Sequence, residues 1–441
     1  MGLFVNIKTV FPEITRDLSS LKVVYQDKEK LFNLIDGVAR EHLTETVIKG
    51  KRVLLKPNWV LHSKNEEDEW CLRTHDSFLL ATLDYVLRLQ PKEVLIGDAP
   101  IQGCQWTKMV NRELIDSVDD LSDKYKIPVA IMDFRRVHFD QELNKVNEEK
   151  EPLDNFVIFD VGKKSYLEPI TKSNSNQFRV TVYNPDRFKE SHRPGVHKYC
   201  ITKELFDADV VISIPKVKTH QKAGITAALK NIVGLNGDKD FLPHHRIGGT
   251  DLGGDCYPGG SRLRYWSELI RDEANRNKGN WKYKFFTRIS SLLWRLSFPK
   301  KVHNTAAGWF GNDTTWRMVM DLNQIVYYGT KEGKLKNNKQ RLFFSLNDGI
   351  IGGQGDGPLK PEPLALGIVS FTNTSSWNDL VLSQLMGMEF RKIPLLVSAK
   401  TFEKNAKVVF KLNGNSVNFK DYSKLAVNAE MPPGWLEYNK N

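Results

Sequence analysis

The stretch "ADVVISIPKVKTHQKAGITAALKNIVG" (residues 208–234) decides the fold, because it joins a buried strand to a short helix through a segment rich in lysine. Its first eight residues form a short, mostly apolar, β-branched run that ends at a proline, a pattern typical of a strand buried on both faces of a parallel sheet. Residues 226–232 are compatible with a helix. The sequence therefore predicts a buried strand that is followed by a lysine-rich segment and then by the start of a helix.

Three other segments show the same short apolar run closed by polar or turn residues, namely residues 52–58, 93–100 and 128–134. The segments between them, residues 74–91 and 107–126, have apolar residues at helical spacing, with Thr74 or Asp76 as the N-cap of the first. This alternation predicts an α/β fold, a mainly parallel sheet with right-handed connections and helices on both faces.

We expect one α/β domain over residues 1–441. Residues 145–190 are interpreted as an antiparallel appendage, and residues 237–318, which are rich in Gly, Arg and Trp, as an insertion over the sheet's edge. The α/β pattern resumes with a strand and glycine-rich loop at residues 340–353, followed by a further strand and helix.

Composition restricts the partners and the location. The formal net charge of +11 favours anionic partners, whereas the dispersed basic residues and the lack of a recognised module disfavour nucleic acid. No apolar run reaches about 18 residues and no secretory signal pattern begins the chain, so we expect a cytoplasmic protein. The scattered cysteines include no CxxC pair, which predicts free thiols and no iron–sulfur cluster: Cys71, Cys104, Cys200 and Cys256.

Polar residues stand at the ends of four predicted strands. Ligands of parallel α/β sheets bind beyond the carboxyl ends of the strands, where the connecting loops converge. Polar residues after a single strand are common because they favour turns, but polar residues after four strands favour a shared pocket. The residues are Lys56 and Asn58; Asp98; Lys216, Lys218 and His220; and Asn347 and Asp348.

The segment after Pro215 predicts an anion site. Lys216 and Lys218 share one face if the segment is extended, Thr226 could cap the following helix, and Lys230 and Asn231 lie on that helix. A helix N-terminus with nearby lysines suits a phosphate or carboxylate. The alternative is a solvated basic loop. The pattern GxxxxGK[ST] is absent, so this is not a Walker A loop.

The segment "DKDFLPHHR" (residues 238–246) has two interpretations. Asp238, His244 and His245, with Asp98, could bind a divalent metal ion. Alternatively, His244, His245 and Arg246 could clamp a phosphate or carboxylate. The spacing matches no specific metal motif, and both interpretations stay open.

Residues 280–301 have the composition of a helix that lies in a membrane interface. Apolar residues recur at helical spacing, basic residues surround them, and the segment contains no acidic residue; the apolar positions include Phe285, Ile289, Leu292 and Leu296. The alternative is an amphipathic helix packed against its own domain.

Together these motifs resemble a known family. "LLKPNWV", "GDAP", the block of residues 209–234, "MDLNQIVYYG", "NDGIIGGQGDGP" and "LALGIVSFTN" occur in the order found in the domain of unknown function 362. The resemblance implies a cytoplasmic α/β domain, and many relatives carry ferredoxin-type iron–sulfur modules and are suspected of redox roles. This chain lacks the cluster cysteines, and Asn373 stands where the family usually has an aspartate.

The sequence thus favours an enzyme that acts on an anionic, phosphorylated substrate, with group transfer in glycan or lipid-linked precursor synthesis as the pathway class. His220 is the candidate acid or base, and Asp98 and Asp348 are catalytic polar or metal-binding partners. One alternative is a non-catalytic protein that binds anionic lipid at the inner face of the membrane. Another is an oxidoreductase with a diffusible cofactor.

Overall fold

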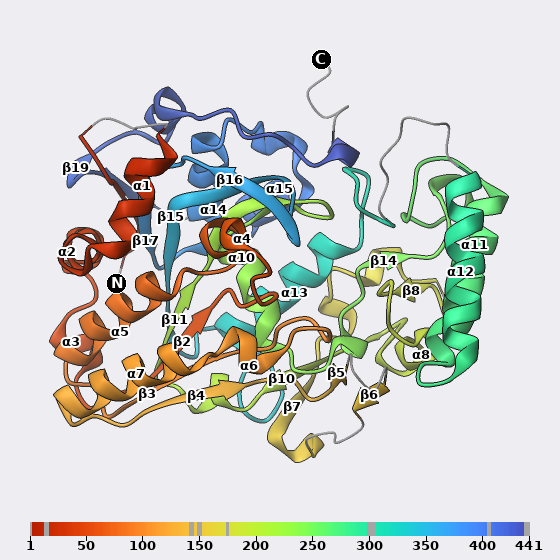
Figure 1. Cartoon of the computed structure of the whole chain (residues 1–441), viewed down its shortest axis with the longest axis horizontal. Helices are drawn as coiled ribbons and strands as arrows, with labels where there is room; N and C mark the ends of the chain where they lie inside the picture. Colours follow the sequence, from red (N-terminus) through yellow and green to blue (C-terminus); the bar gives the residue numbers. More distant parts are fainter. Residues whose placement is uncertain are drawn as a thin grey trace.

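The computed structural model describes residues 2–12, 17–140, 145–147, 152–172, 176–297, 306–403 and 407–435. Within these residues, twelve strands form one large sheet through the middle of the molecule (Figure 1). The order of its main path is β19 (Asn415–Ser416), β18 (Val408–Leu412), β1 (Leu3–Thr9), β17 (Ile368–Thr372), β15 (Leu342–Asp356), β11 (Val210–Ile214), β2 (Arg52–Pro57), β3 (Glu93–Asp98) and β4 (Val129–Asp133).

The predicted parallel strands are present and adjacent. β4, β3, β2, β11 and β15 run parallel to one another, and β17 then pairs antiparallel with both β15 and β1. The four strands predicted from apolar runs correspond to β2, β3, β4 and β11. The α/β prediction with a mainly parallel sheet is therefore confirmed.

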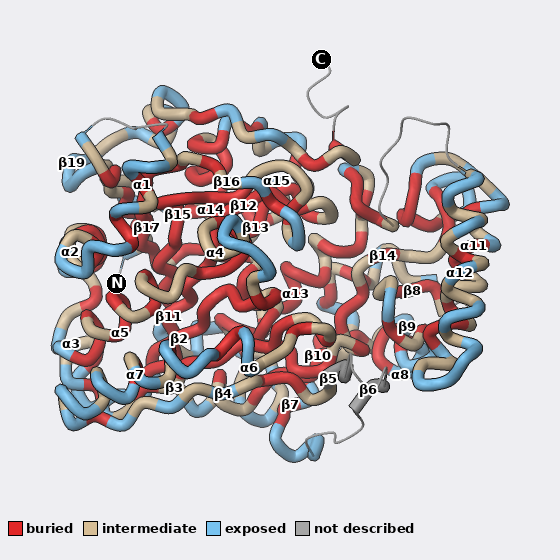
Figure 2. Tube along the Cα trace, in the orientation of Figure 1, coloured by how far each residue is buried: buried red, intermediate tan, exposed pale blue. Residues whose placement is uncertain are grey.

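Two hydrophobic cores lie on the two faces of the sheet. Val53 and Leu55 point into one core and Leu54 into the other, so successive residues of β2 are buried on opposite faces. The middle strands of the sheet, such as β2, β11, β15 and β17, are accordingly buried, whereas the edge strands β4, β18 and β19 are partly exposed (Figure 2). One core contains α1 (Leu18–Gln26), α2 (Lys28–Ala39), α5 (Asp76–Arg88) and α7 (Arg112–Tyr125); the other contains α10 (Ala228–Asn231), α13 (Thr315–Tyr328), α14 (Ser375–Leu385) and α15 (Pro394–Phe402).

The starts of two predicted helices differ from expectation. α5 is capped by His75, whose Nδ1 accepts the amide of Ser77 at 3.2 Å, and not by Thr74 or Asp76. The Thr74 hydroxyl is buried and accepts the amide of Asn58. The second helix divides into α6 (Trp106–Met109) and α7, because the side chain of Asn111 caps a new helix.

The glycine-rich segment after Asn347 is not a loop at a strand tip. β15 continues through it to Asp356 and pairs with β12 (Lys216–His220) and β16 (Lys360–Leu364). β12 in turn forms an antiparallel hairpin with β13 (Gly224–Thr226). Asn347 and Asp348 therefore lie inside a strand, and the chain after Pro215 is a hairpin followed by a helix.

In the part of the chain that the structure describes, three small antiparallel sheets lie beside the large sheet, and they include residues of the predicted appendage and insertion. β7 (Phe156–Asp160), β10 (Val196–Thr202) and β9 (His192–Arg193) form an antiparallel sheet, and β5 (His138–Asp140) pairs with β6 (Lys145–Asn147). β8 (Phe178–Arg179), in the predicted appendage, pairs with β14 (His245–Arg246), in the predicted insertion.

A helical hairpin of α11 (Arg262–Arg276) and α12 (Trp281–Leu296) stands at the outer edge of this part of the molecule (Figure 1). α12 corresponds to the helix predicted over residues 280–301, of which residues 298–301 lie outside the described residues. None of the described helices combines the length and the apolar character that crossing a membrane requires.

The pair of Lys216 and Asp348 provides a test of this arrangement. The Lys216 Nζ lies 2.6 Å from the Asp348 Oδ2, and both side chains are fully buried. Asp348→Asn would leave the Lys216 charge buried without its partner, so we expect the free energy of unfolding to fall by about 3–5 kcal/mol in urea denaturation. Glu45→Gln, which removes an exposed ion pair with Lys49, should cost less than about 1 kcal/mol. Equal losses in the two variants would contradict the buried pair.

Candidate functional site

A cavity of about 460 Å³ lies where the carboxyl ends of β2 and β3 meet the β12–β13 hairpin and α10. The structure brings to its wall the predicted residues Asn58, Asp98, Lys218, His220, Thr226, Lys230, Asn231 and His244. These residues lie up to 186 positions apart in the chain, from Asn58 to His244. We refer to this space as the strand-tip cavity.

Lys56 and Asp98 form a buried ion pair at the base of the strand-tip cavity. The Lys56 Nζ lies 2.8 Å from the Asp98 Oδ1. The amide of Ala99 donates to the same oxygen at 2.8 Å, and the amide of Trp59 donates to Oδ2 at 2.7 Å. Both carboxylate oxygens thus accept hydrogen bonds from the protein, so Asp98 organises the two strand ends. Its predicted catalytic or metal-binding role stays a prediction.

Gly234 passes directly over this ion pair. A Cβ atom at this position would lie 1.7 Å from the Asp98 Oδ1 and 2.7 Å from the Lys56 Nζ. The Gly234 carbonyl also accepts the amide of Ala99 at 2.8 Å. A residue without a side chain is therefore required here.

Asn231 connects α10 to the end of β2. Its Oδ1 accepts from the Asn58 Nδ2 at 3.1 Å, and its Nδ2 donates to the Lys56 carbonyl at 3.1 Å and to the Ser213 hydroxyl at 2.9 Å. The Asn58 Oδ1 and the Thr226 Oγ1 are buried and have no hydrogen-bond partner among the described residues. These two atoms belong to residues of the cavity wall.

Lysines dominate the charge of the strand-tip cavity. Among the described residues, none of the cavity lysines pairs with a carboxylate: Lys218, Lys222, Lys230, Lys239 and Lys360. Lys218 donates to the carbonyls of Leu72 and Pro358, and Lys239 to that of Ala99 at 2.8 Å. The acidic residues of the wall are Asp98, already paired, and Asp356. The cavity therefore carries excess positive charge.

Burial lowers the pKa of four of these lysines, namely Lys218, Lys222, Lys230 and Lys239. Loss of hydration, with further repulsion from neighbouring lysines, lowers the pKa of Lys218 to about 7 and that of Lys230 to about 7. Burial likewise lowers the pKa of Lys239 to about 8. Sequence reasoning did not single out Lys222, which lies in the lysine-rich stretch, or Lys239, which lies in the segment of residues 238–246.

The two histidines of the wall have different tautomers. The His220 Nδ1 accepts the amides of Lys222 and Ala223 at 3.0 and 3.2 Å, which places its proton on Nε2. The His244 Nδ1 lies 2.6 Å from the Leu242 carbonyl and so donates, which leaves Nε2 as an acceptor. Burial and nearby lysines hold both pKa values well below the ordinary range. Hence His220 is suited to donate a hydrogen bond, and the proton-accepting role predicted for it fits His244.

The α10 N-terminus is not an open anion cradle. The amides of Ala228 and Leu229 each donate at 2.9 Å to the carboxylate of Asp379, which comes from α14. The N-cap residue is Ala227, and Thr226 instead ends β13. The predicted capping role of Thr226 was therefore wrong, because a carboxylate distant in the sequence already binds these amides.

Several predicted site residues lie outside the strand-tip cavity. Lys216 and Asp348 neutralise each other in the interior, so Asp348 does not share a pocket with Asp98 and His220. Asp238 pairs with Arg136 at 2.5 Å, and Arg246 lies 3.6 Å from Asp255. His245 lines a second cavity. The structure does not gather the predicted metal ligands Asp98, Asp238, His244 and His245 into one site.

Comparison with known proteins finds one family model, and it describes a domain of unknown function. Residues 160–374 match the model of the domain of unknown function DUF362, so the resemblance seen in the sequence is confirmed over this range. A crystal structure of a Thermotoga maritima protein, solved as a structural genomics target, aligns with 10% identity over 77% of this chain and 54% of that chain, with a TM-score of 0.35. The chain thus spans about half the length of that protein. No curated protein matches significantly.

Gly234→Ala tests how the site is held together. The added methyl group would displace the Lys56–Asp98 pair, and we expect a loss of about 3 kcal/mol or more in the free energy of unfolding, measured by urea denaturation. Gly2→Ala is the control, because a Cβ there meets no atom within 4 Å. Wild-type stability in Gly234→Ala would show that the two strand ends do not depend on this contact.

Proposed function

We propose that the protein is an enzyme that binds an anionic, phosphorylated small molecule in the strand-tip cavity. The observation that carries this proposal is the set of cavity lysines without a carboxylate partner among the described residues. Burying ammonium groups without counter-charge is costly, and a bound anion would offset that cost. Phosphate oxygens accept several charge-assisted hydrogen bonds at once and so match a group of convergent lysines.

The cavity also suits the remainder of such a molecule. A volume of about 460 Å³ falls in the range of pockets that enclose small metabolites. Between the lysines, its wall contains Val60, Ile101, Val180, Leu242 and Leu359. The ligand we propose has one charged end and a larger body that is less polar.

The two histidines support group transfer as the reaction class. The His244 Nε2 could accept a proton from an attacking hydroxyl, while the His220 Nε2–H could donate a hydrogen bond to an anionic oxygen. The lysines would stabilise negative charge that develops during the transfer. A bound anion would also raise the low pKa of His244 and make it a stronger base.

Binding of pyrophosphate tests the cavity. Lys222→Met or Lys230→Met should weaken its affinity about tenfold or more in isothermal titration calorimetry, because a charge-assisted contact contributes about 1.5–3 kcal/mol. Lys51→Met, at an exposed lysine outside the cavity, is the matched control and should bind as wild type does. The affinity should also fall as the pH rises from 6 to 9, since Lys218 and Lys230, with a pKa of about 7, then lose their charge. Equal affinities in all variants, or no pH dependence, would contradict the proposal.

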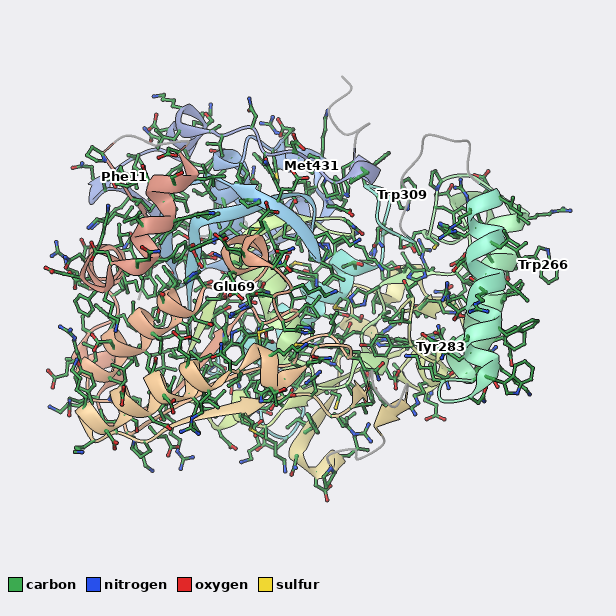
Figure 3. The ribbon with its side chains drawn as sticks, viewed as in Figure 1. Phe11, Glu69, Trp266, Tyr283, Trp309 and Met431 are labelled. Atoms are coloured by element: carbon green, nitrogen blue, oxygen red, sulfur yellow. The ribbon has the colours of Figure 1, made fainter. Side chains whose placement is uncertain are left out.

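A second proposal concerns the α11–α12 hairpin, which buries polar side chains and exposes apolar ones, the reverse of the usual arrangement. The side chains that α11 buries include Arg264, Ser267, Glu268, Asp272 and Asn275, and α12 buries Ser290. Its outward face is apolar: Trp266 is 59% exposed and points away from the molecule (Figure 3). The exposed side chains continue with Leu263, Trp281, Phe285, Leu292 and Leu296.

The charge of the hairpin complements an anionic bilayer. α12 contains no acidic residue and exposes Lys282, Lys284, Arg288 and Arg295. The acidic Asp272 of α11 faces inward and pairs with Arg179 at 2.9 Å. We propose that this face lies on a membrane surface, because basic residues contribute about 1 kcal/mol each near anionic lipid and the exposed rings can enter the interface.

Sedimentation with liposomes tests this second proposal. Binding should increase with the phosphatidylserine content, decrease with added salt, and fall at least tenfold in the variant Phe285→Asp/Leu292→Asp. Val23→Asp changes an exposed apolar residue on another helix and should bind normally. Wild-type binding by the double variant would overturn the proposal, and so would a concentration-dependent dimer in light scattering that the double variant abolishes.

A further inference from the structure

Three potential metal-ligating side chains lie together beneath the α11–α12 hairpin. They are His245 in β14, Cys256 in the loop after residue 252, and Glu268 in α11. One ligand atom of each lies within 4.8 Å of those of the others, and the side chains are 3%, 1% and 8% exposed. The sequence pointed to His245 but not to the other two.

Apart from the contact between the Cys256 thiol and the Glu268 carboxyl group, two polar atoms of this cluster have no partner in the described part of the surrounding protein. The His245 Nε2 lies 3.6 Å from the Glu268 Oε1, which is beyond hydrogen-bond distance. The Glu268 Oε1 and the His245 Nδ1 are buried and have no hydrogen-bond partner among the described residues. A buried carboxylate oxygen without a partner is costly and indicates a missing ligand.

We propose that His245, Cys256 and Glu268 bind one Zn²⁺ ion. Ligand atoms placed tetrahedrally at ordinary zinc distances lie about 3.5 Å apart, close to the separation of the His245 and Glu268 atoms. A thiolate with an imidazole selects zinc over Mg²⁺ or Ca²⁺, which prefer oxygen ligands. Binding would release the thiol proton of Cys256, and the Zn–S, Zn–N and Zn–O bonds would form without any redox change.

The local backbone holds two of these residues in place. The Cys256 amide donates to the Gly248 carbonyl at 3.0 Å, and its carbonyl accepts the Ala307 amide at 2.8 Å. The Gly248 amide in turn donates to the Glu268 Oε2 at 2.9 Å, which leaves Oε1 for the ion. Gly254 permits this tight loop, because a Cβ there would lie 2.1 Å from the Gly248 carbonyl oxygen. The site is therefore preorganised.

The zinc ligands are not among the residues of the proposed anion site, although the two cavities share the wall residues Val180, Thr181 and Ala306. His245 and Glu268 line a second cavity of about 300 Å³, which also contacts Ser267, Ser290 and Trp294 of the helical hairpin. Three protein ligands leave a fourth position, and the cavity gives water access to it. Because the ligands come from β14, a loop and α11, the ion would cross-link the hairpin to the body of the protein.

Titration of the metal-free full-length protein with Co²⁺ tests the site. We expect one equivalent to produce the thiolate-to-cobalt absorption of a cysteine ligand and the visible bands of a tetrahedral ion, and Zn²⁺ to displace it. Cys256→Ser should abolish the thiolate absorption, and Glu268→Gln should weaken binding at least tenfold. Cys104→Ser, at a buried cysteine outside the cluster, should bind as wild type does. Zn²⁺ should also raise the melting temperature of the wild type but not that of Cys256→Ser.

The wild-type titration alone can overturn the proposal, whatever the variants do. Absence of the thiolate absorption in a protein that gel filtration shows to be folded would do so. Retention of that absorption in Cys256→Ser would also do so, because another cysteine would then be the ligand. Neither result depends on pyrophosphate binding, so the anion site and the zinc site stand or fall separately.

Discussion

The ion pair between Lys56 and Asp98 is the contact on which the arrangement of the site depends. It joins the ends of two adjacent parallel strands, and its carboxylate also binds the first amides of the chains that leave them. A buried ion pair contributes little net stability because desolvation offsets most of the attraction. Its contribution is to fix the positions of the two strand ends. Gly234 packs against the pair and Asn231 of α10 donates to the Lys56 carbonyl, so the wall of the cavity is built around these atoms.

The same pair explains why the cavity stays positive. Asp98 is one of the two carboxylates of the wall, and Lys56 neutralises its charge. Asp348 and Asp379 are likewise committed elsewhere, to Lys216 and to the amides of α10. Of the lysines that remain, Lys218 and Lys239 donate to carbonyl oxygens, which lowers the cost of burial without neutralising the charge. An anion from outside is the natural complement to such a wall.

The strands and their shared edge could be predicted from the sequence, because residues buried on both faces produce short apolar runs and parallel strand ends must meet. The continuation of β15 through the glycine-rich segment could not be predicted. Glycines usually weaken a strand, but here Gly352 and Gly353 lie against Val217 and Lys218, where a Cβ would not fit. Which lysine is neutralised could not be predicted either, since Asp348 reaches Lys216 from a distant part of the chain. The histidine tautomers depend on backbone contacts that no spacing reveals.

The helical hairpin shows a related limit of sequence patterns. Its apolar face was evident, but periodicity does not tell whether that face turns inward or outward. The structure exposes Leu263 and Trp266 of α11, and the side chains that α11 buries are mostly polar, so hydrophobic burial contributes little to holding it in place. Its inner face must rely on directed contacts, such as the Arg179–Asp272 pair and the bond from the Ser267 hydroxyl to the Ser290 carbonyl. A metal ion that joins Glu268 to β14 would act in the same way, since a coordinated helix keeps one orientation while its apolar surface remains free to meet a membrane.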